Sequence, residues 1–215
     1  MAPSLTTKLQ NGSVYADMKH IRNFIEKGTL PDIHEDMGVA LAMVPEEQRA
    51  AAIDFGACHG MLSIRARTLG WKKVFGLEAD KASVEHHNQY VRTAGVTLIN
   101  TKLDVTSAAF AATIKDMCKN EGINTFISRR VLCELLGTTF GYTRDHWDEV
   151  VAAGGKMANA AHDAGIYWWV TEGRARTGNP THPVDNVLRE IEAITSTGKF
   201  EVVERHKECA VLKRV

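Results

Sequence analysis

The chain has 215 residues, of which 44% are hydrophobic and 24% are charged. This composition is that of a globular protein and excludes a disordered, collagen-like or coiled-coil chain, while the length fits one domain with at most a small appendage. The 26 Lys and Arg residues balance 26 Asp and Glu residues, so the net charge provides no global field for attracting nucleic acid or an anionic membrane.

The cysteines and apolar segments indicate the compartment. Cys58, Cys118, Cys133 and Cys209 are scattered without a CxxC pair, which favours neither a disulfide framework nor a zinc site and indicates a reducing environment. The longest apolar runs, such as residues 39–44, are far shorter than the ~20 residues of a spanning helix. The first residues also lack the basic and apolar regions of a secretory signal. We therefore expect a cytoplasmic protein with no membrane partner.

Two helices are predicted before the first strand. Apolar residues recur at helical spacing over residues 14–27, and Gly28 follows as a stop signal. Pro31 opens a second amphipathic segment, which Pro45 ends. We assign residues 1–48 to an N-terminal helical extension that either covers a binding site or supports the sheet from outside.

From residue 50 onward, short β-type segments alternate with amphipathic helical segments, which is the rhythm of a parallel α/β sheet. Strands are expected at residues 50–56, 72–80, 96–105, 123–128 and 166–172, and helices at 61–69, 82–94 and 143–164. Pro183 begins a further helix, and residues 199–215 are typical of two strands joined by a tight turn. Residues 49–215 are thus predicted to form one α/β domain: a seven-stranded, mostly parallel sheet with helices on both faces and an antiparallel C-terminal hairpin.

The loop after the first predicted strand, DFGACHG at residues 54–60, is the first candidate binding site, because ligands of such sheets bind beyond the carboxyl ends of the strands. Glycine lacks the Cβ that would hold a ligand off the backbone, and the following helix offers free N–H groups to an anionic group. Gly56 and Gly60 do not have the spacing of a nicotinamide GxGxxG motif. Met61 and Leu62 stand where a Walker loop needs Lys and Ser or Thr.

AIDFGACHG resembles the first motif of the class I S-adenosylmethionine-dependent methyltransferases, which have a Rossmann-like fold. That motif is an acidic residue, a bulky residue, Gly, variable or small residues and Gly, and Cys58 stands at the family's common middle glycine. The DFGA and HG portions also resemble a subgroup that methylates sugar or polyketide hydroxyls. The resemblance implies S-adenosylmethionine as cofactor, in contact with Asp54, Gly56, Ala57, Cys58, His59 and Gly60.

Glu78 ends the second predicted strand, where the family carries its second acidic motif. A carboxylate at that place can accept hydrogen bonds from both ribose hydroxyls. The resemblance further implies that Asp104, in the LDV segment closing the third strand, binds the adenine amino group, and that the Val105 backbone meets the ring. Ala79 and Ser128 complete the predicted cofactor site.

The acceptor side is expected at the end of the fourth strand, in ISRRVLCE. The Asp or Asn, Pro-Pro and aromatic signature of enzymes that methylate amino groups of nucleic acids is absent. Cys133 lacks the preceding Pro of a cytosine C5 nucleophile, so we interpret it as a packed thiol. Arg129 and Glu134 are the catalytic candidates. Arg129 either grips an acidic acceptor or pairs with a neighbouring carboxylate, and Glu134 is either a general base or solvent-exposed.

The histidines and the end of the fifth strand have more than one interpretation. His59 contacts either the ligand or only its own loop. His86 and His87 point about 100° apart on a helix and cannot share one metal-binding face, so no metal ligands are assigned. Glu172, like Arg174 and Arg176, borders either the site or a solvated rim. Trp168 and Trp169 are interpreted as a buried strand covered by helices on both sides.

The sequence thus predicts an S-adenosylmethionine-dependent methyltransferase that acts on a hydroxyl or amine of a small molecule by in-line transfer. Net charge does not favour a nucleic-acid partner. Two alternatives stay open: a nucleic-acid or protein methyltransferase, which needs a basic face, and a catalytically inactive cofactor-binding or scaffold subunit of the same fold. The oligomeric state is not predicted.

Overall fold

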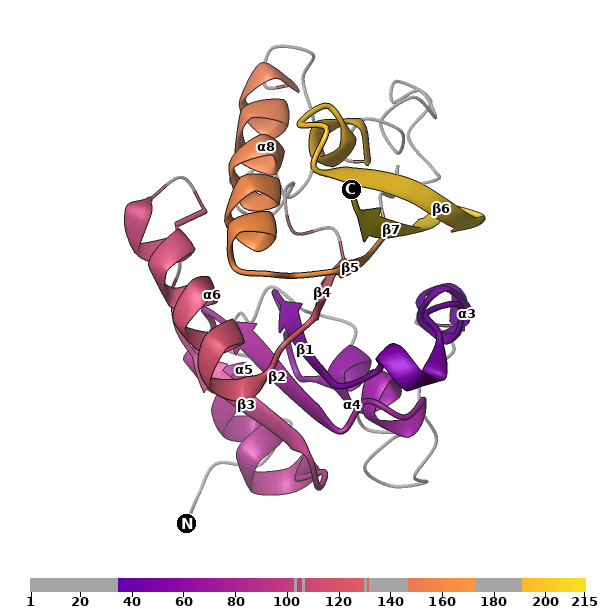
Figure 1. Ribbon diagram of the computed structural model, residues 1–215. Helices are drawn as coiled ribbons and strands as arrows, with labels where there is room; N and C mark the ends of the chain where they lie inside the picture. The colour runs from indigo at the N-terminus through magenta and orange to yellow at the C-terminus, as the bar shows by residue number, and fades with distance from the viewer. Residues whose placement is uncertain (1–34, 103, 106, 130, 132–146, 173–190) are drawn as a thin grey trace, which may run out of the picture.

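The computed structural model describes residues 35–102, 104–105, 107–129, 131, 147–172 and 191–215 (Figure 1). Several predicted features lie outside these residues: the helix at 14–27, Arg130, Cys133, Glu134, Arg174, Arg176 and the beginning of the helix after Pro183.

Seven strands form one sheet in the order β3-β2-β1-β4-β5-β7-β6. The strands are β1 (Ala51–Phe55), β2 (Lys73–Glu78), β3 (Val96–Asn100), β4 (Thr125–Arg129), β5 (Trp168–Glu172), β6 (Phe200–His206) and β7 (Cys209–Arg214). Strands β1 to β5 run parallel to one another, whereas β7 runs antiparallel to both β5 and β6. The predicted mostly parallel sheet with an antiparallel C-terminal hairpin is confirmed.

Helical segments precede the first strand and connect the later ones. They are α3 (Glu35–Ala42), the short 3-10 helix η2 (Glu46–Gln48), α4 (Met61–Thr68), α5 (Lys81–His86), the π-helix η3 (His87–Val91), α6 (Ala108–Glu121) and α8 (Trp147–Asp163). The predicted helices at 61–69 and 143–164 correspond to α4 and α8, and the one at 82–94 is divided into α5 and η3.

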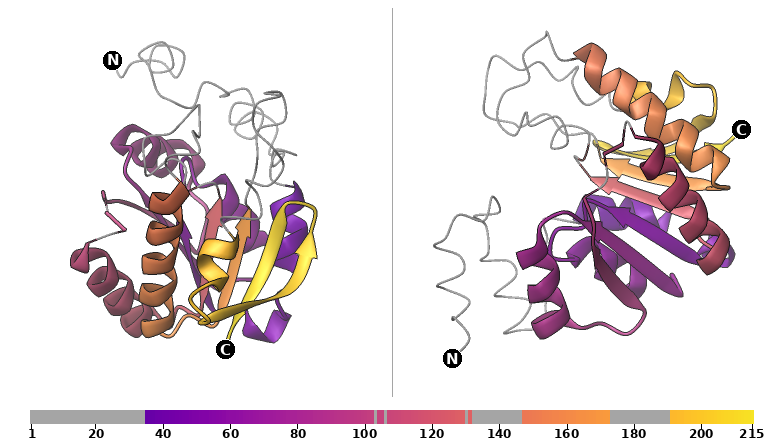
Figure 2. Two further views of the ribbon diagram at one scale, coloured as in Figure 1. Left: turned by 90° about the horizontal axis from the view of Figure 1, so that it is seen from above. Right: turned by 90° about the vertical axis from the view of Figure 1, so that its left-hand side faces the viewer.

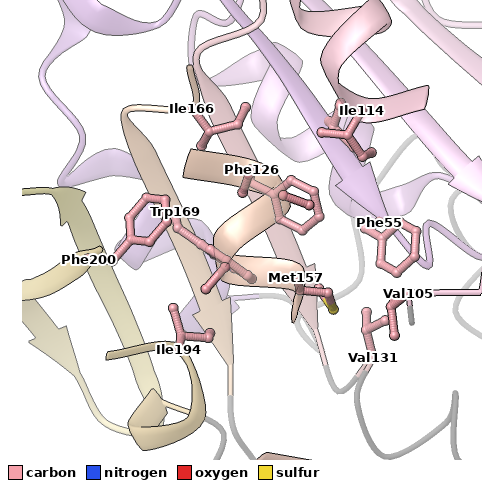
Figure 3. Packing of buried hydrophobic residues seen from close by; sticks show 14 of the residues in the cluster. Phe55, Val105, Ile114, Phe126, Val131, Met157, Ile166, Trp169, Ile194 and Phe200 are labelled. Carbon is pink, nitrogen blue, oxygen red and sulfur yellow. The ribbon is translucent and has the colours of Figure 1, made fainter. Parts of the chain in front are cut away.

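Apolar residues of alternating strand positions fill two hydrophobic clusters, one on each face of the sheet. Helices α6 and α8 cover one face, where Phe126 and Trp169 pack with Met157 (Figure 3). On the other face, Leu41 of α3 and Trp168 of β5 belong to the second cluster, together with residues of α4. Figure 2 shows the sheet between these two layers. The tryptophans are therefore buried on opposite faces of β5, as predicted.

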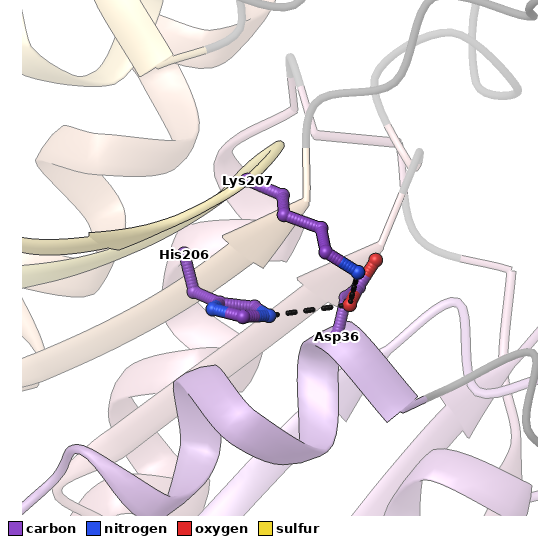
Figure 4. A network of polar contacts seen from close by, with 3 residues as sticks. All are labelled: Asp36, His206 and Lys207. Carbon is purple, nitrogen blue, oxygen red and sulfur yellow. Dashed lines mark hydrogen bonds and ion pairs between the residues drawn. The ribbon is translucent and has the colours of Figure 1, made fainter.

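Helix α3 is fixed to the sheet by its apolar face and also by a polar contact at its N-terminal end. Asp36 accepts hydrogen bonds from Lys207 Nζ, in the turn between β6 and β7, at 2.7 Å and from Nε2 of His206, the last residue of β6, at 3.2 Å (Figure 4). The described part of the predicted N-terminal extension therefore supports the sheet from outside. None of the helices in the described ranges is long and apolar enough to cross a membrane.

The structure differs from the sequence prediction between residues 100 and 122. Strand β3 ends at Asn100, whose side-chain amide donates to the carbonyls of Glu78 and Ala79, each at 3.1 Å. The LDV segment that was expected to close the third strand therefore follows it. Helix α6 then begins after Ser107, whose hydroxyl accepts from the Phe110 amide at 3.2 Å.

Candidate functional site

The strand order reverses at β1, because β2 and β3 lie on one side of it and β4 and β5 on the other. In open α/β sheets, ligands bind at such a switch point beyond the carboxyl ends of the strands. Asp54 is near the end of β1, Glu78 ends β2, Arg129 ends β4 and Glu172 ends β5. The topology therefore collects four charged side chains at one edge of the sheet.

The loop that follows β1 contains three residues with positive φ: Gly56 at +73°, Cys58 at +52° and Gly60 at +75°. A side chain with a Cβ rarely adopts this left-handed conformation. Cys58 stands where the methyltransferase motif usually has a glycine, so the backbone retains the conformation expected of glycine. The amides of Gly56 and Ala57 both donate to the Leu77 carbonyl, at 2.9 and 3.1 Å, which ties the loop to β2.

The Glu78 carboxylate faces this loop. Its Oε2 accepts from the Cys58 amide at 2.6 Å, and its Oε1 accepts from the Asp80 amide at 2.8 Å. The side chain is buried, with the residue only 6% exposed. A carboxylate has about four acceptor positions. These two bonds therefore leave Glu78 able to accept from further hydroxyl groups.

Asp54 is buried beneath the loop and holds the first turn of α4. Its Oδ2 accepts from the Ser63 hydroxyl at 2.6 Å. Burial raises the pKa of Asp54 from 3.8 to about 6; the Ser63 hydroxyl opposes this rise and the nearby Glu78 charge adds to it. Two acidic groups are thus placed in one poorly hydrated region, which favours a positively charged ligand.

The two loop glycines make room for protein side chains. A Cβ on Gly56 would lie 3.0 Å from Val131 Cγ2, and one on Gly60 would lie 2.6 Å from His87 Nδ1 and 2.8 Å from Leu98 Cδ1. Close packing within the protein is therefore a second reason for these glycines, beside the predicted approach of a ligand. The loop surface that stays accessible is Gly56, which is exposed, and Cys58, which is half-buried.

The other predicted cofactor residues differ in their exposure. Ala79 and Asp104 are exposed, whereas Ala57, His59, Val105 and Ser128 are buried. The His59 ring packs edge-on against the His86 ring, with centroids 5.4 Å apart. Val105 belongs to the hydrophobic cluster of Figure 3. Ser128 accepts from Trp169 Nε1 at 2.9 Å and donates to Thr171 at 3.0 Å, so its hydroxyl is used within the sheet.

Arg129 pairs with the neighbouring carboxylate, which was one of its two predicted roles. Its Nε donates to Glu172 Oε2 at 2.5 Å. The Nη2 atom is buried and has no hydrogen-bond partner among the described residues. Glu134, the other catalytic candidate, lies outside those residues. Within the described ranges, no group of three or more His, Cys, Asp or Glu side chains is arranged to hold a metal ion.

Sequence reasoning missed three residues that shape the site: Ser63, Val131 and His87. Ser63 has a recognisable signal, because a hydroxyl in the first turn of a helix commonly bonds a nearby acid or backbone group. Val131 and His87 have none, since their contacts with the glycine loop connect segments that are far apart in the sequence.

No protein-family model and no curated protein sequence matches this chain. Solved structures do. Magnesium protoporphyrin IX methyltransferase from Synechocystis PCC 6803, with bound SAM, has 15% identity and a TM-score of 0.53, with 99% of this chain and 92% of that chain covered. A TehB-like SAM-dependent methyltransferase from Corynebacterium glutamicum has 15% identity and a TM-score of 0.52, with 98% of this chain and 100% of that chain covered.

A third similar structure is a putative RNA methyltransferase from Pyrococcus horikoshii, with 15% identity, a TM-score of 0.52 and coverage of 84% of this chain and 80% of that chain. At such identities the likeness concerns the fold and not the substrate. The chain therefore has the Rossmann-like fold found in solved structures of SAM-dependent methyltransferases.

Proposed function

We propose that this protein is an S-adenosylmethionine-dependent methyltransferase whose cofactor binds at the glycine loop between β1 and α4 and at the end of β2. The observation that carries the proposal is the contact between Glu78 and the Cys58 amide, at 2.6 Å. It places the acidic residue that ends β2 directly against the loop that follows β1. These are two of the three motifs by which the sequence resembles the class I methyltransferases.

The residues present fit this cofactor. Glu78 has acceptor positions left for the ribose hydroxyls. Helix α4 begins after Gly60, and the amides of its first turn carry the positive end of the helix dipole, which suits an anionic group of the ligand. Asp54 and Glu78 together supply negative charge for a cationic ligand.

S-adenosylmethionine supplies an activated methyl group when it is bound. The chain's own contribution is alignment, because correctly oriented reactants gain about 7–11 kcal/mol from proximity alone. Arg129, at the end of β4, lies on the side of the site where we place the acceptor, and Glu134 is proposed as the base that removes an acceptor proton. The proposed acceptor is a hydroxyl or amine of a small molecule in the cytoplasm, in keeping with the balanced charge of the chain.

Titration calorimetry with S-adenosylmethionine and S-adenosylhomocysteine tests cofactor binding. We expect both ligands to bind the unmodified chain, and Glu78→Gln to weaken binding by about tenfold or more, because a charged acceptor is lost. Glu85→Gln is the matched control, since Glu85 is an exposed carboxylate on α5 that pairs only at the surface with Lys81, at 3.6 Å. If neither ligand produced heat, the result would support the scaffold alternative instead.

The acceptor class needs a separate experiment. The protein and methyl-labelled S-adenosylmethionine are incubated in three parallel reactions. Each reaction contains one fraction of a cell extract: small molecules, RNA or protein. Transfer of label to the small-molecule fraction is expected. Label in RNA or protein would overturn the proposed acceptor class while leaving methyl transfer itself established.

A further inference from the structure

Two consecutive histidines, His86 and His87, pack against His59 of the glycine loop. His86 ends α5 and His87 begins the π-helix η3. Both are buried, at 3% and 1% exposure, whereas consecutive residues of a regular α-helix point about 100° apart. The His86 ring contacts the His59 ring, and His87 Nδ1 lies 2.9 Å from the His59 carbonyl oxygen. Both side chains thus reach the same loop residue.

The hydrogen bond of His87 defines its tautomer. A carbonyl oxygen can only accept, so His87 Nδ1 must carry the hydrogen and donate it to His59. In the neutral ring, Nε2 is then a bare lone pair. This atom is buried and has no hydrogen-bond partner among the described residues. Burial lowers the pKa of His87, in agreement with a neutral ring that donates from Nδ1 alone.

The same ring also limits where the end of the loop can lie. Gly60 precedes α4 with φ at +75°, and a Cβ on it would come within 2.6 Å of His87 Nδ1. The same Cβ would lie 2.8 Å from Cδ1 of Leu98, a residue of β3. The backbone at residues 59 and 60 is therefore held by one hydrogen bond and by close packing from two elements.

We propose that His87 is a positioning residue for the glycine loop: its Nδ1–H bond to the His59 carbonyl holds the backbone that presents the Cys58 amide to Glu78. The consequence for cofactor affinity rests on the proposed function. The contacts described for His87 are with His59 and Gly60, which are the buried residues at the end of the loop. His87 acts through the loop backbone and is distinct from the residues that would contact a ligand.

The test compares three variants of the full chain. His87→Leu keeps an apolar side chain of moderate size and removes the donor, whereas His87→Asn can donate from its amide nitrogen near the position of Nδ1. Gln89→Leu is the matched control, because Gln89 is an exposed residue of the same π-helix. We expect His87→Leu to weaken S-adenosylhomocysteine binding by about tenfold, and the other two variants to stay within about twofold of the unmodified chain.

Nitrogen-15 NMR of the unliganded protein provides a readout that does not depend on the cofactor. The His87 ring should carry its hydrogen on Nδ1 and not on Nε2, and the Gly60 amide resonance should move in His87→Leu and not in His87→Asn. A hydrogen on Nε2 in the neutral ring would overturn the proposal. Equal weakening of binding in the Leu and Asn variants would also overturn it, because the loss of ring packing would then explain the weaker binding without the hydrogen bond.

The two proposals fail in different ways. If the unmodified chain binds neither S-adenosylmethionine nor S-adenosylhomocysteine, the proposed function fails, while the ring tautomer and the Gly60 resonance still decide the role of His87. If His87→Leu does not fold, the Asn variant and the tautomer decide it.

Discussion

Arg129 and Glu172 are direct neighbours across the ends of β4 and β5 and form an ion pair, with Nε and Oε2 2.5 Å apart. Their side chains are only 17% and 8% exposed. Removing one member of such a pair leaves an uncompensated charge in a poorly hydrated place, which costs more than removing both. The pair thus makes the carboxyl ends of β4 and β5 sensitive to single substitutions.

Glu172→Ala should therefore lower the free energy of unfolding by about 3 kcal/mol, and the double variant Arg129→Met, Glu172→Ala should lose less. Lys73→Ala is the control, because Lys73 and Glu121 form an exposed pair worth less than about 1 kcal/mol. Urea denaturation measures all three variants. A double variant that is less stable than Glu172→Ala would contradict this account of the pair.

Asp54→Asn should change how stability depends on pH. Since burial raises the Asp54 pKa from 3.8 to about 6, the folded chain holds a proton that the unfolded chain has released within that window. The stabilisation from this proton is present below the unfolded pKa and is lost as pH rises through about 6. The free energy of unfolding of Asp54→Asn, measured relative to that of the unmodified chain, should thus rise by on the order of 3 kcal/mol between about pH 4 and about pH 8.

Urea denaturation of both chains at the two pH values checks this expectation. Asp116→Asn, on the exposed side of α6, is the control and should show no such gain. A constant difference between Asp54→Asn and the unmodified chain at both pH values would show that the Asp54 pKa is not raised.

Cys58→Gly should stabilise the fold. Cys58 has φ at +52°, a conformation that costs a residue with a Cβ roughly 1–2 kcal/mol and costs glycine little. Part of this gain is offset by the greater freedom of glycine in the unfolded chain, so a net gain of about 0.5–1 kcal/mol is expected. The bond to Glu78 is unaffected because it uses the backbone amide. Cys58→Val, measured by the same thermal unfolding, should destabilise the fold, and a stabilising Val would argue against strain at this position.

The contact of α3 with the C-terminal hairpin should contribute less to stability than the apolar face of the same helix. Asp36 and Lys207 are 41% and 65% exposed, so solvent screens their attraction. Lys207 lowers the pKa of Asp36, so this stabilisation is present above pH 3.8 and is lost as the pH falls further. Asp36→Asn should leave the urea midpoint nearly unchanged at neutral pH.

Leu41→Ala, at a fully buried position of the same helix, should lower the free energy of unfolding by about 2–5 kcal/mol. Similar losses in the two variants would show that the polar contact is stronger than its exposure suggests.

The sequence pattern was sufficient to predict the sheet and the position of Glu78 beside the glycine loop. Buried strands in a parallel sheet have nearly continuous apolar sequences, and the ends of adjacent strands meet by topology alone. Helix α6 was missed because its buried stripe is narrow: only Phe110, Ile114 and Cys118 are buried. The end of the third strand was placed too late because its apolar pattern continues past Asn100, whose side chain bonds the backbone at the end of β2.

Features that depend on contacts between distant segments were not predictable from the sequence. His86 and His87 both have α-helical backbone angles, and yet both side chains contact His59 of the loop. Similarly, whether Arg129 pairs with a ligand or with Glu172 is decided by the register of β4 and β5. Composition and periodicity carry no information on either point.

Strand β7 follows β6 in the chain and yet lies between β5 and β6 in the sheet. Strand β6 is therefore connected to the sheet only through a segment that is synthesised after it. Until residues 209–214 leave the ribosome, β6 has no strand to pair with and the edge of β5 is open. Among the described strands, β6 and the outer edge of β5 thus stay unpaired in the growing polypeptide until residues 209–214 are available, and a variant lacking these residues would keep both unpaired.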